Sequence, residues 1–213
     1  MPGAARGVRP ETNYAMPQAI QIIQKEHRFI TSVVEAIARI GAAIDVGTLA
    51  PDFRLLHAMV DYIDRFPERL HHPKEDRLLF AAIERRTGEG AAEIAALRRE
   101  HEGSYPALER LRAALVDLEQ HKEGAATRFA ETAATYADFH WRHMRTEEEV
   151  VLPLARRVLD AADWKELDAA FAENVELSEA GENGRQLRQL FREIANLTPA
   201  PLGLGGGEGP RRS

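Results

Sequence analysis

Apolar residues recur along the chain with spacings that alternate between three and four, the pattern of a helix that buries one face against its neighbours. Four long stretches carry this pattern. The first, from about 17 to 44, has the stripe Ile20, Ile23, His27, Ile30, Val34 and Ile37. The second begins near Asp52 and has the stripe Leu56, Met59, Ile63, Phe66 and Leu70, followed after a one-residue step by His71, Glu75, Leu78 and Ala82. Pro67 and Pro73 lie around this step, and a proline kinks a helix because it lacks a backbone donor.

Two further stretches repeat the pattern. The third, from about 91 to 122, has the stripe Ile94, Leu97, His101, Ser104, Leu108, Leu111 and Leu115. The fourth follows Gly124 and has the stripe Phe129, Ala133, Tyr136, His140, His143, Glu147, Val150 and Leu154. Four long helices with short connections most simply run up, down, up, down. The sequence therefore predicts an all-α fold, an antiparallel four-helix bundle with short additional C-terminal helices.

The ends of the chain differ from this central part. Residues 1–15 and 198–213 are rich in glycine, proline and arginine, and we expect both to be disordered. The bundle occupies 16–160, and 161–197 forms a C-terminal helical extension. Two amphipathic segments of this extension, about 161–173 and 184–197, are expected to dock on the bundle or on a second subunit, so a homodimer is left open. The start of translation is not decided between Met1 and Met16.

The composition of the chain excludes several classes of function. The 213 residues carry a net charge of −6 without a long basic run, which argues against nucleic-acid binding. The absence of cysteine excludes disulfides, thiolate metal sites and cysteine nucleophiles. Neither a signal peptide nor an apolar run of about 20 residues is visible, so we expect a cytoplasmic protein without membrane contact.

Ionisable residues interrupt the predicted core. The inward stripes carry six such candidates, namely His27, His71, Glu75, His101, His143 and Glu147. Leaving these groups unpaired in a bundle core would cost several kcal/mol each. One buried histidine alone is more often hydrogen-bonded than metal-bound. Here, however, four helices each contribute one, and two helices repeat a His-x3-Glu pair whose members lie on the same helix face.

The pattern also repeats internally. Lys25-Glu26-His27 resembles Arg99-Glu100-His101, and the segment 71–76 resembles 143–148. A bundle with this approximate twofold symmetry would surround two metal ions. Two divalent ions carry four positive charges, which two carboxylates and a bridging oxide or hydroxide largely balance. Four imidazoles and two carboxylates without sulfur suit iron or manganese, with zinc as an alternative, and leave coordination positions open for a small molecule.

Other histidines and Tyr136 are weaker candidates for the metal site. His140 lies one turn before His143 and is interpreted as an extra ligand or as a hydrogen-bond partner near the site. His72 points about 100° away from His71 in an α-helix, so we expect it to be peripheral. His57 and His121 lie off the stripes and are expected at the surface. Tyr136 is interpreted as core packing.

At these residues the chain resembles the hemerythrin-like family of bacterial HHE domains, over roughly residues 17–160. The resemblance rests on His27, HHPKED at 71–76, REHE at 99–102 and HWRHMRTEEE at 140–149. It implies a non-haem, oxo- or hydroxo-bridged centre of two Fe ions, with His27 and His71 on one iron, His101 and His143 on the other, and Glu75 and Glu147 bridging. It also implies that the ligand is O2, NO or peroxide.

The chain departs from the oxygen-carrying hemerythrins in two places. Leu97 stands where those proteins have an additional histidine, and Glu147 follows His143 by four residues where they have an aspartate after five. A missing nitrogen ligand would leave one iron more open, which favours a redox reaction or nitric oxide binding over reversible oxygen carriage. The predicted role is sensing, scavenging or oxidative and nitrosative stress protection, with peroxidase- or oxidase-like catalysis left open.

Two alternatives compete with this hypothesis. A ferritin-like diiron oxidase or peroxidase would use Glu-x-x-His on two helices. Glu68 and His71 form this motif once, but His140 precedes His143 and Ala137 precedes His140, so there is no second copy. The other alternative is a metal-free helical interaction module with a buried polar network. The sequence does not identify the physiological ligand, the electron donor or a signalling partner.

Overall fold

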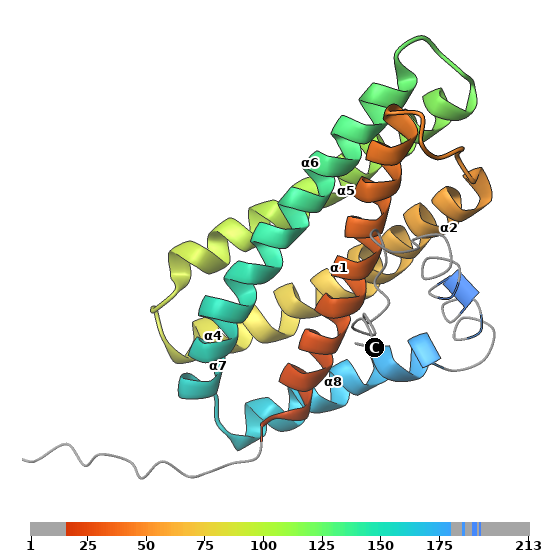
Figure 1. The fold of residues 1–213 in the computed structure, drawn as a ribbon. Helices are drawn as coiled ribbons and strands as arrows, with labels where there is room; N and C mark the ends of the chain where they lie inside the picture. Colours follow the sequence, from red (N-terminus) through yellow and green to blue (C-terminus); the bar gives the residue numbers. More distant parts are fainter. Residues whose placement is uncertain (1–15, 180–184, 186–188, 191, 193–213) are drawn as a thin grey trace, which may run out of the picture.

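The computed structural model describes residues 16–179, 185, 189, 190 and 192, and the part of the chain that it describes is helical without strands. The continuous segments α1, α2 to α4, α5 and α6 to α7 form four helical rods. These rods lie side by side in an elongated bundle (Figure 1). The first and third are the long helices α1 and α5, and the second and fourth are built from consecutive helical segments. The elements are α1 (Gln18–Asp45), α2 (Phe53–Ile63), η1 (Asp64–His71), α3 (His72–Lys74), η2 (Glu75–Phe80), α4 (Ala81–Arg86), α5 (Ala91–Glu119), α6 (Ala125–Thr146), η3 (Glu147–Val151), α7 (Leu152–Val158) and α8 (Ala161–Glu179). The expected all-α helical bundle is confirmed.

Local chemistry explains several of the helix boundaries. The side chain of Asp52 accepts a hydrogen bond of 3.1 Å from the backbone N–H of Leu55, which caps α2. Gly90 and Gly124 precede α5 and α6 with φ of 76° and 67°, a backbone conformation that glycine adopts without steric cost. Within α1, Gly41 allows the close approach of α6, since a Cβ atom at this position would lie 3.2 Å from the Cα atom of Ala130.

The three η segments are π-helical, and each shifts the buried face of its rod by one residue. A π-helical turn holds one more residue than an α-helical turn, and Pro67 inside η1 cannot donate the ordinary helical hydrogen bond. This accounts for the predicted step before His71. The prediction that Val150 lies on the inward stripe is wrong, because η3 moves Val151 into the core and leaves Val150 39% exposed. The η2 segment similarly buries Leu79 more deeply than the predicted Leu78.

The apolar core consists of two clusters with a polar layer between them. One cluster contains the C-terminal part of α1, α2 and the neighbouring parts of α5 and α6. The other contains the start of α1, the residues from Leu79 to Ile83, the start of α5 and α7. On each of the four rods, ionisable residues separate the residues of one cluster from those of the other. All the predicted stripe positions from Ile20 to Ile37, from Leu56 to Phe66 and from Ile94 to Leu115 are buried.

Helix α8 packs on the outside of the bundle against α1 (Figure 1). Leu167 and Phe171 are fully buried against the second apolar cluster, and Trp164 is half-buried there. The Asp168 carboxylate accepts a 2.7 Å hydrogen bond from the backbone N–H of Ala19, and Lys74 donates to the carbonyl of Ala170. The first amphipathic segment of the predicted extension therefore docks on the bundle of the same chain.

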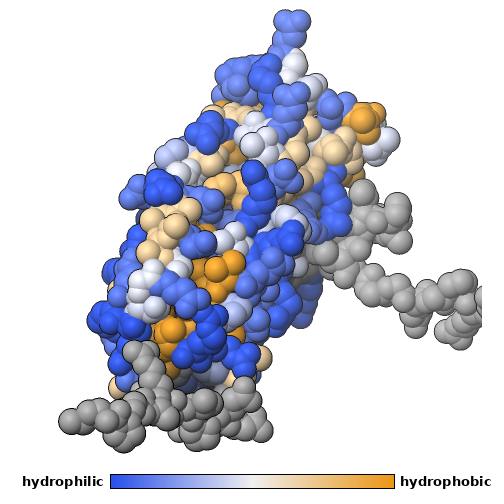
Figure 2. All heavy atoms as spheres, turned by 90° about the vertical axis from the view of Figure 1, so that its left-hand side faces the viewer, coloured by the Kyte–Doolittle hydropathy of each residue, from blue (hydrophilic) through white to orange (hydrophobic). Residues whose placement is uncertain are grey.

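The remaining predictions about the chain ends lie outside the described residues. This applies to 1–15, to 198–213 and to most of the segment 184–197, of which Leu190 is described and buried. The face of the molecule in Figure 2 is mostly hydrophilic, with small separate apolar areas. Among the described helices, none has the length and apolar character needed to cross a bilayer.

Candidate metal centre

Four imidazoles meet in the polar layer, one from each rod. The Nε2 atoms of His27 and His71 are 3.2 Å apart, and those of His101 and His143 are 3.0 Å apart. All four rings are buried. Two nitrogen ligands at about 2.1 Å from one ion and at right angles to each other lie about 3 Å apart. Each pair therefore has the spacing of two ligands on a shared ion.

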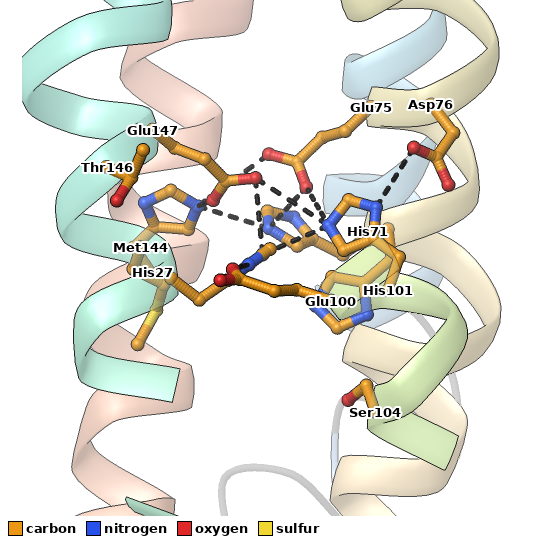
Figure 3. Close-up of polar contacts among 12 residues, drawn as sticks. His27, His71, Glu75, Asp76, Glu100, His101, Ser104, Met144, Thr146 and Glu147 are labelled. Carbon is orange, nitrogen blue, oxygen red and sulfur yellow. Dashed lines mark hydrogen bonds and ion pairs between the residues drawn. The ribbon is translucent and has the colours of Figure 1, made fainter. Parts of the chain in front are cut away.

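Two carboxylates point at these nitrogens from above, from opposite sides of the centre (Figure 3). Glu147 places Oε2 3.3 Å from His27 Nε2, and Oε1 3.3 Å from His143 Nε2. Glu75 places Oε2 3.4 Å from His71 Nε2 and 3.7 Å from His101 Nε2. Each carboxylate thus faces both histidine pairs, which is the arrangement of a bridging ligand.

These two carboxylates have no hydrogen-bond donor in the part of the chain that the structure describes. All four of their oxygens are buried without a hydrogen bond among the described residues, and both side chains are 0% exposed. The polar groups that face them are the histidine nitrogens at 3.3 to 3.7 Å. A buried carboxylate without hydrogen bonds is expensive unless a cation compensates its charge. The site consequently consists of two overlapping groups of four ligands that share Glu75 and Glu147, the first with His27 and His71 and the second with His101 and His143.

The outer nitrogens of the same rings each face a further carboxylate. His71 Nδ1 lies 2.8 Å from Glu26 Oε2, and His143 Nδ1 lies 2.9 Å from Glu100 Oε2. His27 Nδ1 and His101 Nδ1 lie 2.9 and 3.0 Å from carboxylate oxygens, and their partners are Glu148 and Asp76. A carboxylate on Nδ1 keeps the proton there and directs the lone pair of Nε2 to the centre, as is usual for metal-binding histidines.

These four carboxylates were not predicted from the sequence as part of the site, although the internal repeat contains the signal. Glu26 and Glu100 directly precede the lone histidines, and Asp76 and Glu148 directly follow Glu75 and Glu147. Each contacts the histidine of a neighbouring rod rather than a residue of its own helix. The internal repeat therefore contains two related signals, a Glu-His pair and a pair of adjacent carboxylates. Both signals supply carboxylates for the outer nitrogens of histidines on neighbouring rods.

The buried carboxylates of the centre favour positive charge on the groups around them. Burial lowers the pKa of His27, but Glu147, Glu148 and Glu75 together raise it well above the ordinary value. Burial likewise opposes protonation of the other pair, yet the nearby carboxylates raise the pKa of His101 to about 10 and that of His143 to about 9. Burial raises the pKa of Glu147, but the surrounding histidines bring it well below its usual range. Either protons on the imidazoles or metal ions can supply this charge.

The structure corrects the prediction for His72 and refines those for its neighbours. His72 is 4% exposed rather than peripheral, because the π-helical turns on both sides rotate it inward, and its ring stacks on His101 with centroids 4.3 Å apart. His140 is fully buried, but neither ring nitrogen has a hydrogen-bond partner among the described residues. Tyr136 packs in the core as expected, and its hydroxyl lies 3.5 Å from Glu68.

The off-stripe histidines lie at the surface, as predicted. His57 is partly exposed and pairs with Glu119, and His121 is exposed in a turn with a φ of 53°.

Comparison with known proteins agrees with this geometry. The family model of the hemerythrin HHE cation-binding domain matches residues 18–155, which includes all six predicted ligands. The chain therefore belongs to the hemerythrin HHE cation-binding family, and the suspected relationship is confirmed. No curated protein and no solved structure matches the chain.

Proposed function

We propose that the chain binds two iron ions within an antiparallel up-down-up-down four-helix bundle and uses them to bind O2 or a related small molecule such as NO or peroxide. The observation that carries this proposal is the pair of four-ligand groups that share Glu75 and Glu147. Oxygen and nitrogen donors without sulfur match the preference of non-haem iron. The proposed role is sensing, scavenging or protection against oxidative and nitrosative stress.

The protein's own residues would hold the ions in a defined arrangement. His27 and His71 would bind one ion, His101 and His143 the other, and the two glutamates would bridge them. Iron would supply redox chemistry and a coordination position for an exogenous ligand. Because six protein donors do not saturate two six-coordinate ions, the centre has room for such a ligand.

The surroundings would control access and charge. The two apolar clusters enclose the polar layer along the bundle axis, which limits the entry of bulk water. The carboxylates on the outer nitrogens keep the imidazoles oriented and increase their basicity. These features support the binding of a small molecule at the centre.

The direct experiment measures metal content and absorption spectra after expression in iron-rich medium. We expect two irons per chain and a spectrum that changes when the reduced protein meets air or NO. Alanine substitution of His71 or Glu147 should lower the metal content, whereas the same substitution of the partly exposed His57, which lies away from the centre, should not. Wild-type protein with well below one metal per chain would contradict the proposal and favour the metal-free module.

The ferritin-like alternative gains no support from the positions of the carboxylates. That class would need four protein carboxylates on the metals. Here two carboxylates face the centre, and four others contact the outer nitrogens of the histidines. Glu68, the residue of the single Glu-x-x-His motif, accepts a hydrogen bond from Ser104.

A further inference from the structure

The polar layer continues on the side of the centre that faces away from Glu75 and Glu147. Figure 3 shows these two glutamates on one side of the histidines and Ser104 on the other side. His140 precedes His143 by three residues, whereas Glu147 follows it by four. At 1.5 Å per residue, His140 lies about 4.5 Å from His143 along the helix axis, in the direction away from Glu147. A small molecule that binds on this side of the centre therefore meets polar side chains that are not metal ligands.

Three of these neighbouring polar groups are directed at the carboxylate of Glu68. The hydroxyl of Ser104 donates a hydrogen bond to Oε1 of Glu68, and the hydroxyl of Tyr136 lies 3.5 Å from the same oxygen. Nδ1 of His72 faces Oε2 of Glu68 at 3.8 Å. The two hydroxyls and this ring nitrogen are therefore oriented toward Glu68.

His140 has no such partner in the part of the chain that the structure describes. Its side chain is fully buried, and Nδ1 and Nε2 both lie without a hydrogen bond there. Burial lowers the pKa of His140 to about 3, so the ring is neutral at physiological pH and carries one N–H. A buried donor without an acceptor costs free energy. This donor lies one helical turn from His143, where a molecule bound at the centre can supply the missing acceptor.

The distances argue against metal binding by His140 itself. Among the described residues, neither of its ring nitrogens belongs to the groups of ligand atoms that lie within 4.8 Å of one another. Its ring centroid lies 6.4 Å from that of His143, and the two ring planes meet at 76°. His140 is therefore too remote to share an ion with its neighbours, but a bound molecule of two or three atoms can span the remaining distance.

The chemistry of the proposed small molecules requires a donor at this place. Anionic ligands such as peroxide and azide carry negative charge on the atoms that point away from the metal. An N–H held in a site without bulk water stabilises this charge. The neighbouring residues of α1 on this side, Ile30 and Val34, are buried and apolar, so their side chains offer no donor. His140, with both nitrogens unpaired, is the side chain that meets this requirement.

We propose that His140 donates a hydrogen bond to the small molecule that binds at the metal centre. This inference rests on the proposed function. It makes His140 a residue that determines ligand preference, because anionic molecules that accept a hydrogen bond are then bound more tightly than molecules that do not. The ring positions and stabilises the bound molecule without contacting the metal.

Azide is a suitable probe, because it is an anionic acceptor with a strong infrared stretching band. In the iron-loaded protein we expect this band to shift after exchange into D2O, since the donated proton is replaced by deuterium. His140→Leu should retain two irons per chain, lose the D2O shift and bind azide at least about tenfold more weakly. His140→Gln keeps an N–H donor and should recover the D2O shift and part of the affinity.

Tyr136→Phe is the matched control. Tyr136 is buried beside His140, with ring centroids 4.5 Å apart, but its hydroxyl faces Glu68. This variant should retain the azide affinity and the D2O shift of the wild-type protein. A tenfold loss of affinity in Tyr136→Phe would show that the effect is not specific to His140 and would overturn the inference.

The remaining outcomes separate this inference from the proposed function. Unchanged azide affinity and a persistent D2O shift in His140→Leu would overturn the role of His140 and leave the dinuclear centre intact, because another residue such as His72 would then be the donor. Loss of iron from folded His140→Leu would overturn it as well, since His140 would then be a metal ligand. Even when His140→Leu does not fold, iron-loaded wild-type protein without azide binding or without a D2O shift would overturn the inference. Wild-type protein that binds no iron would refute the proposed function itself.

Discussion

The carboxylates on the outer nitrogens should contribute to metal affinity in proportion to their burial. Glu26 and Glu100 occupy equivalent positions in the internal repeat and contact His71 and His143 at 2.8 and 2.9 Å. The side chain of Glu26 is 6% exposed and that of Glu100 is 41% exposed. The substitutions Glu26→Gln and Glu100→Gln remove one negative charge each and keep an oxygen acceptor.

The magnitude follows from the strengths of hydrogen bonds. A hydrogen bond to a charged group contributes about 1.5–3 kcal/mol, against about 0.5–1.5 kcal/mol for a neutral pair. Glu26→Gln should therefore cost about 1–1.5 kcal/mol, or about fivefold to tenfold in metal affinity. Solvent screens the charge of Glu100, so its substitution should cost well below about 1 kcal/mol.

Competition with a metal-binding indicator dye measures these affinities. Glu35→Gln is the matched control, because Glu35 lies on the same helix as Glu26 and pairs with Arg39 at the surface. An affinity of Glu26→Gln equal to that of this control would refute the reasoning. A larger loss for Glu100→Gln than for Glu26→Gln would refute the argument from burial.

Three further predictions concern stability. Gly103→Ala should stabilise the protein by about 0.5–1 kcal/mol in denaturant unfolding, because a Cβ atom at this helical position meets open space. Gly41→Ala should destabilise the protein, because its Cβ atom would overpack the contact between α1 and α6. Equal effects of the two substitutions would contradict the described contact. His140→Leu should stabilise the metal-free protein by about 1 kcal/mol in the same assay. Burial lowers the pKa of His140 to about 3, and neither ring nitrogen has a hydrogen bond among the described residues. A clear loss of stability would show that the ring has a hydrogen-bond partner. The pKa values of His101 and His143, about 10 and about 9, lie above the unfolded value of about 6.5. Their contribution to stability is therefore complete below about pH 6.5 and is lost as the pH rises through about 9 to 10, so the melting temperature of the metal-free protein should fall over this range and that of the metal-loaded protein should fall less. A melting temperature that rises with pH in the metal-free protein would contradict the described charges.

Most of the bundle and the six candidate ligands could be predicted from the sequence because both follow from helical periodicity. A position on an α-helix determines its face, so histidines and glutamates at spacings of three and four had to lie among the buried apolar residues. The order of the two His-x3-Glu pairs and the lone histidines then indicated the family.

Prediction from helical periodicity failed at the π-helical segments. Periodicity assumes 3.6 residues per turn, and η1, η2 and η3 violate this assumption within the site itself. The exchange of Val150 for Val151 and the inward rotation of His72 both follow from it. A proline at 67 suggested a disturbance, but it could not specify the direction of the shift.

The sequence by itself determined which faces are buried and which residue types lie on them, because these depend on local spacing. Only the tertiary structure decided which residues of different helices meet. Contacts such as Glu26 with His71 join positions 45 residues apart, and they depend on the relative rotation and height of two packed helices. The contacts between these carboxylates and the imidazoles that they orient are properties of this packing and not of any single helix.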